Sequence, residues 1–283
     1  RVDKKIEIEM KDQINEAIDW RGEDVDATPK TPANKNLFNE SENSVELGEE
    51  KSDIFHSIVA KLLYMSKRAR PDIEVAVAFL CTRVSKSIDD DWKKLRRILG
   101  FLKGTIDDIR IIGATSVQDL YTWVDASYGI HDDMRSQTGG AMSFGHGVVN
   151  HKSSVQKLNT KSSTEAEVVG TSEYVPYNIW LKNFLDEQGY EIRDNVLFQD
   201  NQSAIKMETN GRKSCTGNSR HIHIRYFFVK DRIDKKEMRI VYCPTNKMLA
   251  DFFTKPLQGE LFNFFRRIVM GWDSIYDLSL IQL

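Results

Sequence analysis

The 283-residue sequence predicts an α/β fold, in which a small helical unit precedes a mixed five-stranded sheet with helices on its faces. Three features of the sequence lead to this prediction. Residues 52–104 carry apolar side chains at helical spacing. Residues 118–153 contain three β-rich segments in close succession. From residue 163 onward, helical and β-rich segments alternate, which is typical of a sheet covered by helices.

The segment before the sheet, residues 52–104, is predicted to form a small group of helices. Pro71 separates the first two helical stretches, and Gly104 ends the last one. The apolar residues at helical spacing are Ile54, Ile58, Leu62 and Met65, followed by Trp92, Leu95, Leu99 and Leu102. Residues 22–50 are rich in Glu, Asp, Asn, Pro and Thr, and we expect a linker or surface loop there.

Five β-rich segments are expected to form the sheet. The first three, at residues 118–128, 137–144 and 147–153, follow one another closely and predict antiparallel pairing, with a hairpin turn at 145–147. The elements predicted after them are a long helix (163–188), a strand (195–199), two helices (201–209 and 219–234), a strand (238–243) and a short helix (246–254).

Composition narrows the class of protein. Hydrophobic residues make up 40% of the chain and charged residues 29%, which is typical of a globular protein and excludes a wholly disordered or collagen-like one. No apolar run approaches the ~18 residues of a membrane span, and the charged first residues are unlike a secretory signal peptide. The 3 scattered cysteines give no disulfide framework. We therefore expect an intracellular protein without a membrane partner, and the start at Arg1 favours a piece of a longer chain.

Four acidic residues stand where predicted strands end or predicted helices begin. Asp125 shares one face of its strand with Tyr121 and Trp123, where a carboxylate is costly unless something compensates it. Asp200 follows the strand at 195–199 directly. The other two candidates lie in the first turns of the long helix and in the last short helix: Glu167 and Asp251.

Each of these acids also has a purely structural explanation. Asp200 is a suitable N-cap for the next helix, and acids early in the long helix suit its macrodipole. Taken together, in this order of strands and helices, the four can converge on one point. Four such carboxylates repel one another in a partly dry site unless cations compensate them. Oxygen ligands without His or Cys favour Mg²⁺ or Mn²⁺, and two such ions are the usual device for in-line displacement at a phosphodiester.

Five motifs resemble the ribonuclease H domain of copia-type LTR retrotransposon polyproteins. They are VDASYGIHDDMRSQTGG (124–140), NTKSSTEAEVVG (159–170), QDNQSAI (199–205), SRHIHIRYFFVKDRI (219–233) and YCPTNKMLADFFTKPL (242–257). Two stretches upstream are similar to the segment that joins the reverse transcriptase to this domain: IVAKLLYMSKRARPDIEVAV (58–77) and WKKLRRILGFLKGT (92–105). The resemblance covers about residues 52–260.

The resemblance implies a ribonuclease H fold and a nuclease that degrades the RNA strand of an RNA–DNA hybrid with two Mg²⁺ or Mn²⁺ ions. The catalytic and metal-binding acids that it implies are Asp125, Glu167, Asp200 and Asp251. Glu165 is the alternative to Glu167, and two positions turn a helix by about 200°, so both cannot point inward alike. Many ribonuclease H domains have a His before the last Asp, whereas this loop reads Pro-Thr-Asn-Lys at 244–247.

A basic stretch with interleaved aromatic residues, 213–239, is a candidate surface for the hybrid. An amphipathic helix with a solvated basic face explains the same pattern equally well. Contacts to 2′-hydroxyl groups would distinguish RNA from DNA. The candidate nucleic-acid-binding residues are Ser127, Ser163, Asn201, Gln202, Arg220 and Arg225.

The resemblance also divides the chain and implies partners. It predicts an acidic linker or end of the polymerase region (1–51), a connection-like helical unit (52–110), a ribonuclease H-like domain (116–258) and a C-terminal tail (259–283). The polymerase palm is expected to be absent from this chain. The implied partners are the hybrid and the remainder of the Pol polyprotein, in a cytoplasmic particle, the nucleus or both.

Two other functions stay open at this point. The chain can be an inactive retrotransposon remnant that only binds nucleic acid, although all four acids are present. It can also be an integrase- or transposase-type nuclease of the same fold, which usually needs three acids rather than four.

Overall fold

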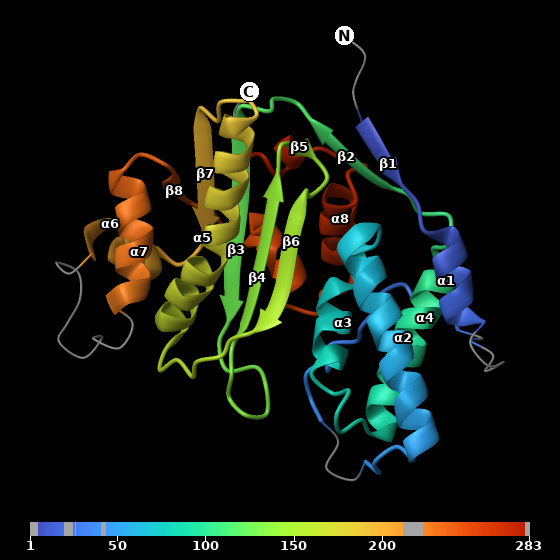
Figure 1. The fold of residues 1–283 in the computed structure, drawn as a ribbon. Helices are drawn as coiled ribbons and strands as arrows, with labels where there is room; N and C mark the ends of the chain where they lie inside the picture. The colour runs from blue at the N-terminus through green and yellow to red at the C-terminus, as the bar shows by residue number, and fades with distance from the viewer. Residues whose placement is uncertain (1–4, 20–24, 26, 41–43, 212–222, 281–283) are drawn as a thin grey trace.

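The computed structural model describes residues 5–19, 25, 27–40, 44–211 and 223–280, and its main feature is a mixed five-stranded sheet (Figure 1). The strand order is β6-β4-β3-β7-β8. The first three strands are antiparallel, and β7 and β8 are parallel to β3. The strands are β3 (Asp119–Ser127), β4 (Gln137–Ser143), β6 (Asn150–Val155), β7 (Asp194–Gln199) and β8 (Arg239–Tyr242). This confirms the predicted α/β architecture with a mixed five-stranded sheet.

The central strand, β3, is buried on both faces because its side chains alternate between two cores. Tyr121 and Trp123 pack into one hydrophobic cluster, and Leu120 and Val124 pack into another on the opposite face. Asp125 therefore lies on the Trp123 face and is 2% exposed. A buried carboxylate on this strand needs compensation, as the sequence predicted.

Helix α5 (Ser163–Glu187) covers one face of the sheet (Figure 1). It begins at Ser162, whose hydroxyl accepts a hydrogen bond from the backbone N–H of Glu165. Helices α6 (Gln202–Asn210) and α7 (His223–Asp234) pack against α5 and against each other. The loop between β7 and α6 thus lies beside the first turns of α5, where Glu167 is located.

The helical unit predicted before the sheet is present, with α2 (Glu49–Arg68), α3 (Glu74–Cys81) and α4 (Asp89–Gly104). Near the N-terminus, the structure contains two elements for which the sequence analysis predicted neither a strand nor a helix. Residues Lys5–Ile8 form β1, and Lys11–Ile18 form α1, which buries Ile14 and Ala17 against the other helices. Both elements are short and rich in charged residues, so they lack the apolar periodicity from which helices and strands are predicted.

A second, three-stranded sheet was also missed by the sequence analysis. It has the order β1-β2-β5, in which β2 is Arg110–Ala114 and β5 is Gly145–His146. The segment at 145–147 is therefore not only a hairpin turn, because its first two residues pair with β2. The third strand of the large sheet consequently begins at Asn150.

The segment predicted as a C-terminal tail contributes to the core. Helix α8 (Gly259–Val269) buries four apolar side chains in the cluster that also contains the helical unit and one face of the sheet: Phe262, Phe265, Ile268 and Val269. The short helix predicted at 246–254 is two 3₁₀ helices instead, η5 (Thr245–Lys247) and η6 (Leu249–Phe253). The predicted segments share one core, and the boundaries between them stay a prediction.

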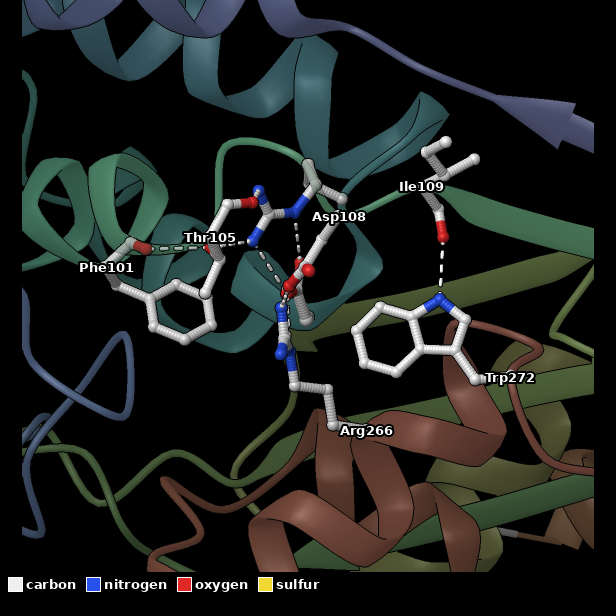
Figure 2. Close-up of polar contacts among 8 residues, drawn as sticks. Phe101, Thr105, Asp108, Ile109, Arg266 and Trp272 are labelled. Carbon is white, nitrogen blue, oxygen red and sulfur yellow. Dashed lines mark hydrogen bonds and ion pairs between the residues drawn. The ribbon is translucent and has the colours of Figure 1, made fainter.

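A buried ion network joins α8 to the helical unit (Figure 2). Arg70 donates two hydrogen bonds of 2.9 Å to the carboxylate of Asp72, and Arg266 of α8 donates to the same carboxylate at 2.9 Å. Arg266 also reaches Asp108, and the indole N–H of Trp272 donates to the carbonyl of Ile109. Burial alone would raise the pKa of Asp72, but the two guanidinium groups lower it to about 2.

Candidate active site

Three acidic side chains meet where β3 and β7 end side by side. Asp125 comes from β3, Glu167 from the second turn of α5, and Asp200 from the residue after β7. One carboxylate oxygen from each residue lies within 4.8 Å of the other two. The parallel pairing of β3 with β7 explains this meeting, because parallel strands place their carboxyl ends at the same edge of a sheet.

The electrostatics of this three-acid cluster show mutual repulsion in a dry site. Burial raises the pKa of Glu167 well above its usual value, and the charges of Asp125 and Asp200 raise it further. Oε2 of Glu167 is buried and has no hydrogen-bond partner among the residues that the structure describes. Burial and Asp125 also raise the pKa of Asp200, against a 3.0 Å hydrogen bond that the Thr245 hydroxyl donates to its Oδ2. An oxygen-only cluster of this kind fits a hard divalent cation such as Mg²⁺ or Mn²⁺.

The fourth predicted acid, Asp251, lies next to Asp125 but outside the three-acid cluster. It comes from η6 and is held by Lys255, whose Nζ lies 2.7 Å from its Oδ1. The same ammonium lies 3.6 Å from Oδ2 of Asp125, which also accepts a hydrogen bond from the hydroxyl of Thr254. Burial and the charge of Asp125 raise the pKa of Asp251 to about 7.

Two adjacent glycines of β4 allow these elements to approach the sheet. Gly139 pairs with Asp125 across the strands, and a Cβ there would lie 2.6 Å from Cγ2 of Thr254 and 2.8 Å from the carbonyl oxygen of Ala250. A Cβ on Gly140 would lie 2.5 Å from the ring of Tyr174 in α5. The two positions face opposite sides of the sheet, so η6 docks on one face and α5 on the other.

Replacing Gly139 by alanine is expected to push η6 away from β3 and to destabilise the fold by about 1–3 kcal/mol, because the added methyl group meets backbone atoms that cannot move aside. Urea denaturation measures this loss. Gly48→Ala is the matched control, since no atom lies within 4 Å of a Cβ at that position. Equal stability of the two variants would contradict the role assigned to Gly139.

The structure brings Glu167, and not Glu165, to the three-acid cluster. Glu167 is 5% exposed, whereas the carboxylate of Glu165 accepts a 2.8 Å hydrogen bond from the backbone N–H of Lys161 at the start of α5. Glu165 thus supports the first turn of the helix, as an acid near a helix N-terminus commonly does. The choice between the two positions is consistent with the rotation expected for a shift of two residues.

The six predicted nucleic-acid contacts are scattered. Ser127 lies on the Asp125 face of β3, and its buried hydroxyl has no hydrogen-bond partner in the part of the chain that the structure describes. Asn201 caps α6, because its side-chain oxygen accepts from two backbone N–H groups. Arg225 donates to Ser172 and pairs with an acid of α5. Ser163 and Gln202 are exposed at the starts of α5 and α6, and Arg220 lies outside the described residues.

The residues that sequence reasoning missed are Thr245, Thr254 and Lys255. Thr245 lies in the loop where many ribonuclease H domains have a His, and it contacts Asp200. Lys255 follows Asp251 by four positions, which is the spacing of an ion pair on one helical face, and this was the available signal. Thr254 gives no sequence signal, since its contact with Asp125 depends on the docking of η6 on β4.

The chain is similar in sequence to Pol polyproteins of plant transposons. It is 30% identical over 216 residues to the retrovirus-related Pol polyprotein from transposon TNT 1-94 of Nicotiana tabacum, covering 76% of this chain and 16% of that protein. It is 31% identical over 217 residues to the Pol polyprotein from transposon RE2 of Arabidopsis thaliana, covering 76% of this chain and 15% of the relative. The chain thus spans about one sixth of the length of these relatives. No protein-family model matches it.

Two solved structures that are similar to part of the chain are ribonucleases H by name. LC11-RNase H1, isolated from compost by a metagenomic approach, is 11% identical, with a TM-score of 0.35 over 47% of this chain and 91% of the other. RNase H1 from Halobacterium salinarum is 14% identical, with a TM-score of 0.31 over 47% and 90% of the two chains. Among the described residues, no helix is long and apolar enough to span a membrane. By its sequence relatives, the chain belongs to the Pol polyproteins of copia-type retrotransposons, and by its strand order its sheet has the ribonuclease H fold.

Proposed function

We propose that this chain is an endoribonuclease that cleaves the RNA strand of RNA–DNA hybrids as part of a retrotransposon reverse transcriptase. The observation that carries the proposal is the three-acid cluster of Asp125, Glu167 and Asp200, whose oxygens converge within 4.8 Å at one edge of the sheet. Asp125 and Glu167 are buried and Asp200 is partly buried, and carboxylates this close together in a partly dry site destabilise a protein unless they bind a cation, so their presence is best explained by function.

The residues would act as follows. Asp125, Glu167 and Asp200 would hold one divalent ion, and Asp125 and Asp251 would provide carboxylates for a second. When bound, Mg²⁺ or Mn²⁺ ions supply an activated water and stabilise the leaving oxygen of the phosphodiester. Thr245 and Thr254 keep the carboxylates of Asp200 and Asp125 in fixed orientations through their hydroxyl hydrogen bonds. Gly139 keeps η6, and with it Asp251, against the strand that carries Asp125.

Recognition of the hybrid is assigned to groups at the rim of this cluster. The exposed side chains of Ser163 and Gln202 lie at the starts of α5 and α6 and can reach 2′-hydroxyl groups or phosphates, whereas the hydroxyl of Ser127 is buried and is a weaker candidate. Asn201 and Arg225 already have partners within the chain, which makes them weaker candidates than the sequence suggested. We place the protein with the rest of the Pol polyprotein in an intracellular particle, the nucleus or both.

A cleavage assay on the full chain tests the proposal. A hybrid with labelled RNA should be cut internally in the presence of Mg²⁺ or Mn²⁺ and should stay intact in EDTA. Duplex DNA and single-stranded RNA of the same sequence serve as matched substrates and should be cut far more slowly. Binding of the hybrid without metal-dependent cleavage would instead favour an inactive remnant, and cleavage of duplex DNA would favour an integrase-type nuclease.

A further inference from the structure

Lys255 is a positive charge placed at the edge of the acid cluster. Its Nζ lies 2.7 Å from Oδ1 of Asp251 and 3.6 Å from Oδ2 of Asp125. The two acidic side chains are 7% and 3% exposed, whereas the lysine side chain is 38% exposed. One ammonium therefore compensates two nearly buried carboxylates while it keeps contact with solvent.

The negative charge of the three-acid cluster and that of the Asp125–Asp251 pair are compensated differently. Asp125 belongs both to the three-acid cluster and to the pair with Asp251. Within the part of the chain that the structure describes, Glu167 and Asp200 have no ion pair of their own, and Oε2 of Glu167 is buried without a hydrogen-bond partner. The three-acid cluster is thus open to an external cation, while the Asp125–Asp251 pair already has one.

An ammonium and a divalent ion cannot both occupy the space between the same two carboxylates. Lysine carries a compact charge on a flexible four-carbon stem, so its head can leave the pair without movement of the backbone. We propose that Lys255 is the resident counter-cation of the Asp125–Asp251 pair, and that a divalent ion binds at this pair only in competition with the lysine ammonium. This inference rests on the proposed function in that it takes the acids as ligands of divalent ions.

Competition of this kind makes metal binding stepwise. The first ion binds at the three-acid cluster, where Lys255 lies near Asp125 at 3.6 Å while Glu167 and Asp200 form no ion pair among the described residues. The second ion binds more weakly, because it must displace Lys255 from Asp251 and Asp125. Removing the charge of Lys255 therefore strengthens the second step and leaves the first step with a smaller change.

Calorimetric titration of the full 283-residue chain with Mn²⁺ tests the inference. The wild-type chain should show two steps, and Lys255→Gln should tighten the second by about tenfold or more, since a competing charge at contact distance is lost. Lys255→Arg keeps the charge and should stay within about twofold of wild type. Lys247→Gln is the matched control, because Lys247 lies in the neighbouring η5 and its Nζ donates to the carbonyl of Ser279 at 3.3 Å, with no ion pair to an acid of the site among the described residues.

A second measurement uses the wild-type chain, in case Lys255→Gln does not fold. In a titration with diamagnetic Mg²⁺, the NMR signal of the Lys255 side chain, assigned by its loss in Lys255→Arg, should move mainly during the second binding step rather than the first. A signal that stays unchanged through both steps overturns the inference. Superimposable isotherms of the wild type and Lys255→Gln, or weaker second binding in Lys255→Gln, also overturn it.

Failure of the inference and failure of the proposed function give different results. Stepwise Mn²⁺ binding with the expected effect of Lys255→Gln, but no cleavage of any hybrid, would support Lys255 as the counter-cation and contradict the proposed nuclease function. Cleavage of hybrids, together with identical isotherms of the wild type and Lys255→Gln, would support the nuclease function and contradict the role of Lys255.

Discussion

Replacing Asp125 by asparagine is expected to reduce metal-dependent cleavage of an RNA–DNA hybrid by at least about a hundredfold, since even partners of metal ligands commonly cost 10–100-fold. Asp125 is the residue shared by the three-acid cluster and by the pair with Asp251. Its loss therefore weakens both sets of carboxylates at once. The rate of hybrid cleavage at saturating Mg²⁺, with the Mn²⁺ isotherm beside it, measures the effect.

The same substitution should leave the metal-free fold intact. Asparagine has nearly the same shape as aspartate, and it removes one of several like charges that repel one another in the buried cluster. The free energy of unfolding without metal should thus change by less than about 1 kcal/mol. A large loss of stability would mean that any lost cleavage reflects unfolding rather than lost ligands.

Asp133→Asn is the matched control for this prediction. Asp133 follows the same strand in the β3–β4 loop, forms a 2.8 Å ion pair with Arg135 and has a side chain that is 53% exposed. Exposed pairs of this type contribute little, so cleavage should change by less than about twofold. Equal rates of hybrid cleavage by Asp125→Asn and Asp133→Asn would contradict the assignment of Asp125 to the active site.

The site can be predicted from sequence as far as its three converging acids. Asp125, Glu167 and Asp200 are recognisable because each stands at the end of a strand or in the first turns of a helix, and strand ends gather at one edge of a sheet. The position of Asp251 relative to them is not recognisable. It depends on how η6 docks on Gly139, a tertiary contact between segments more than 100 residues apart for which local patterns carry no information.

In the fold, too, elements with a periodic apolar pattern are predictable from sequence, whereas elements that depend on tertiary contacts are not. Long periodic helices such as α2 and α4 and the apolar strand β3 are predictable because burial imposes a pattern on them. Strand β1 and helix α1 are short and highly charged, and β1 is stabilised by pairing with β2, about 100 residues away. Helix α8 buries phenylalanines in a core built mainly from earlier segments, so only the assembled structure shows that this segment contributes to the core.

Replacing Asp72 by alanine is expected to have the largest effect on stability, a loss of about 3–5 kcal/mol, because it leaves the buried guanidinium of Arg70 without its carboxylate. Both side chains are almost fully buried, at 1% and 0% exposure for Arg70 and Asp72. Arg266 of α8 loses the same partner, so the contact between α8 and the helical unit weakens as well. Urea denaturation followed by circular dichroism measures the loss.

The matched control is Asp273→Ala, because Asp273 forms the same two-bond pair with Arg267 at the surface, at 2.6 and 2.7 Å. There the arginine is 54% exposed and can regain water, so the expected loss is below about 1 kcal/mol.

The pH dependence separates the two pairs further. Because the pKa of Asp72 is lowered from 3.8 to about 2, its contribution is complete above pH 3.8 and is lost as the pH falls towards 2. Stability of the wild type should therefore fall more steeply than that of Asp72→Ala over this range, and parallel curves would show that burial, rather than charge, governs this junction.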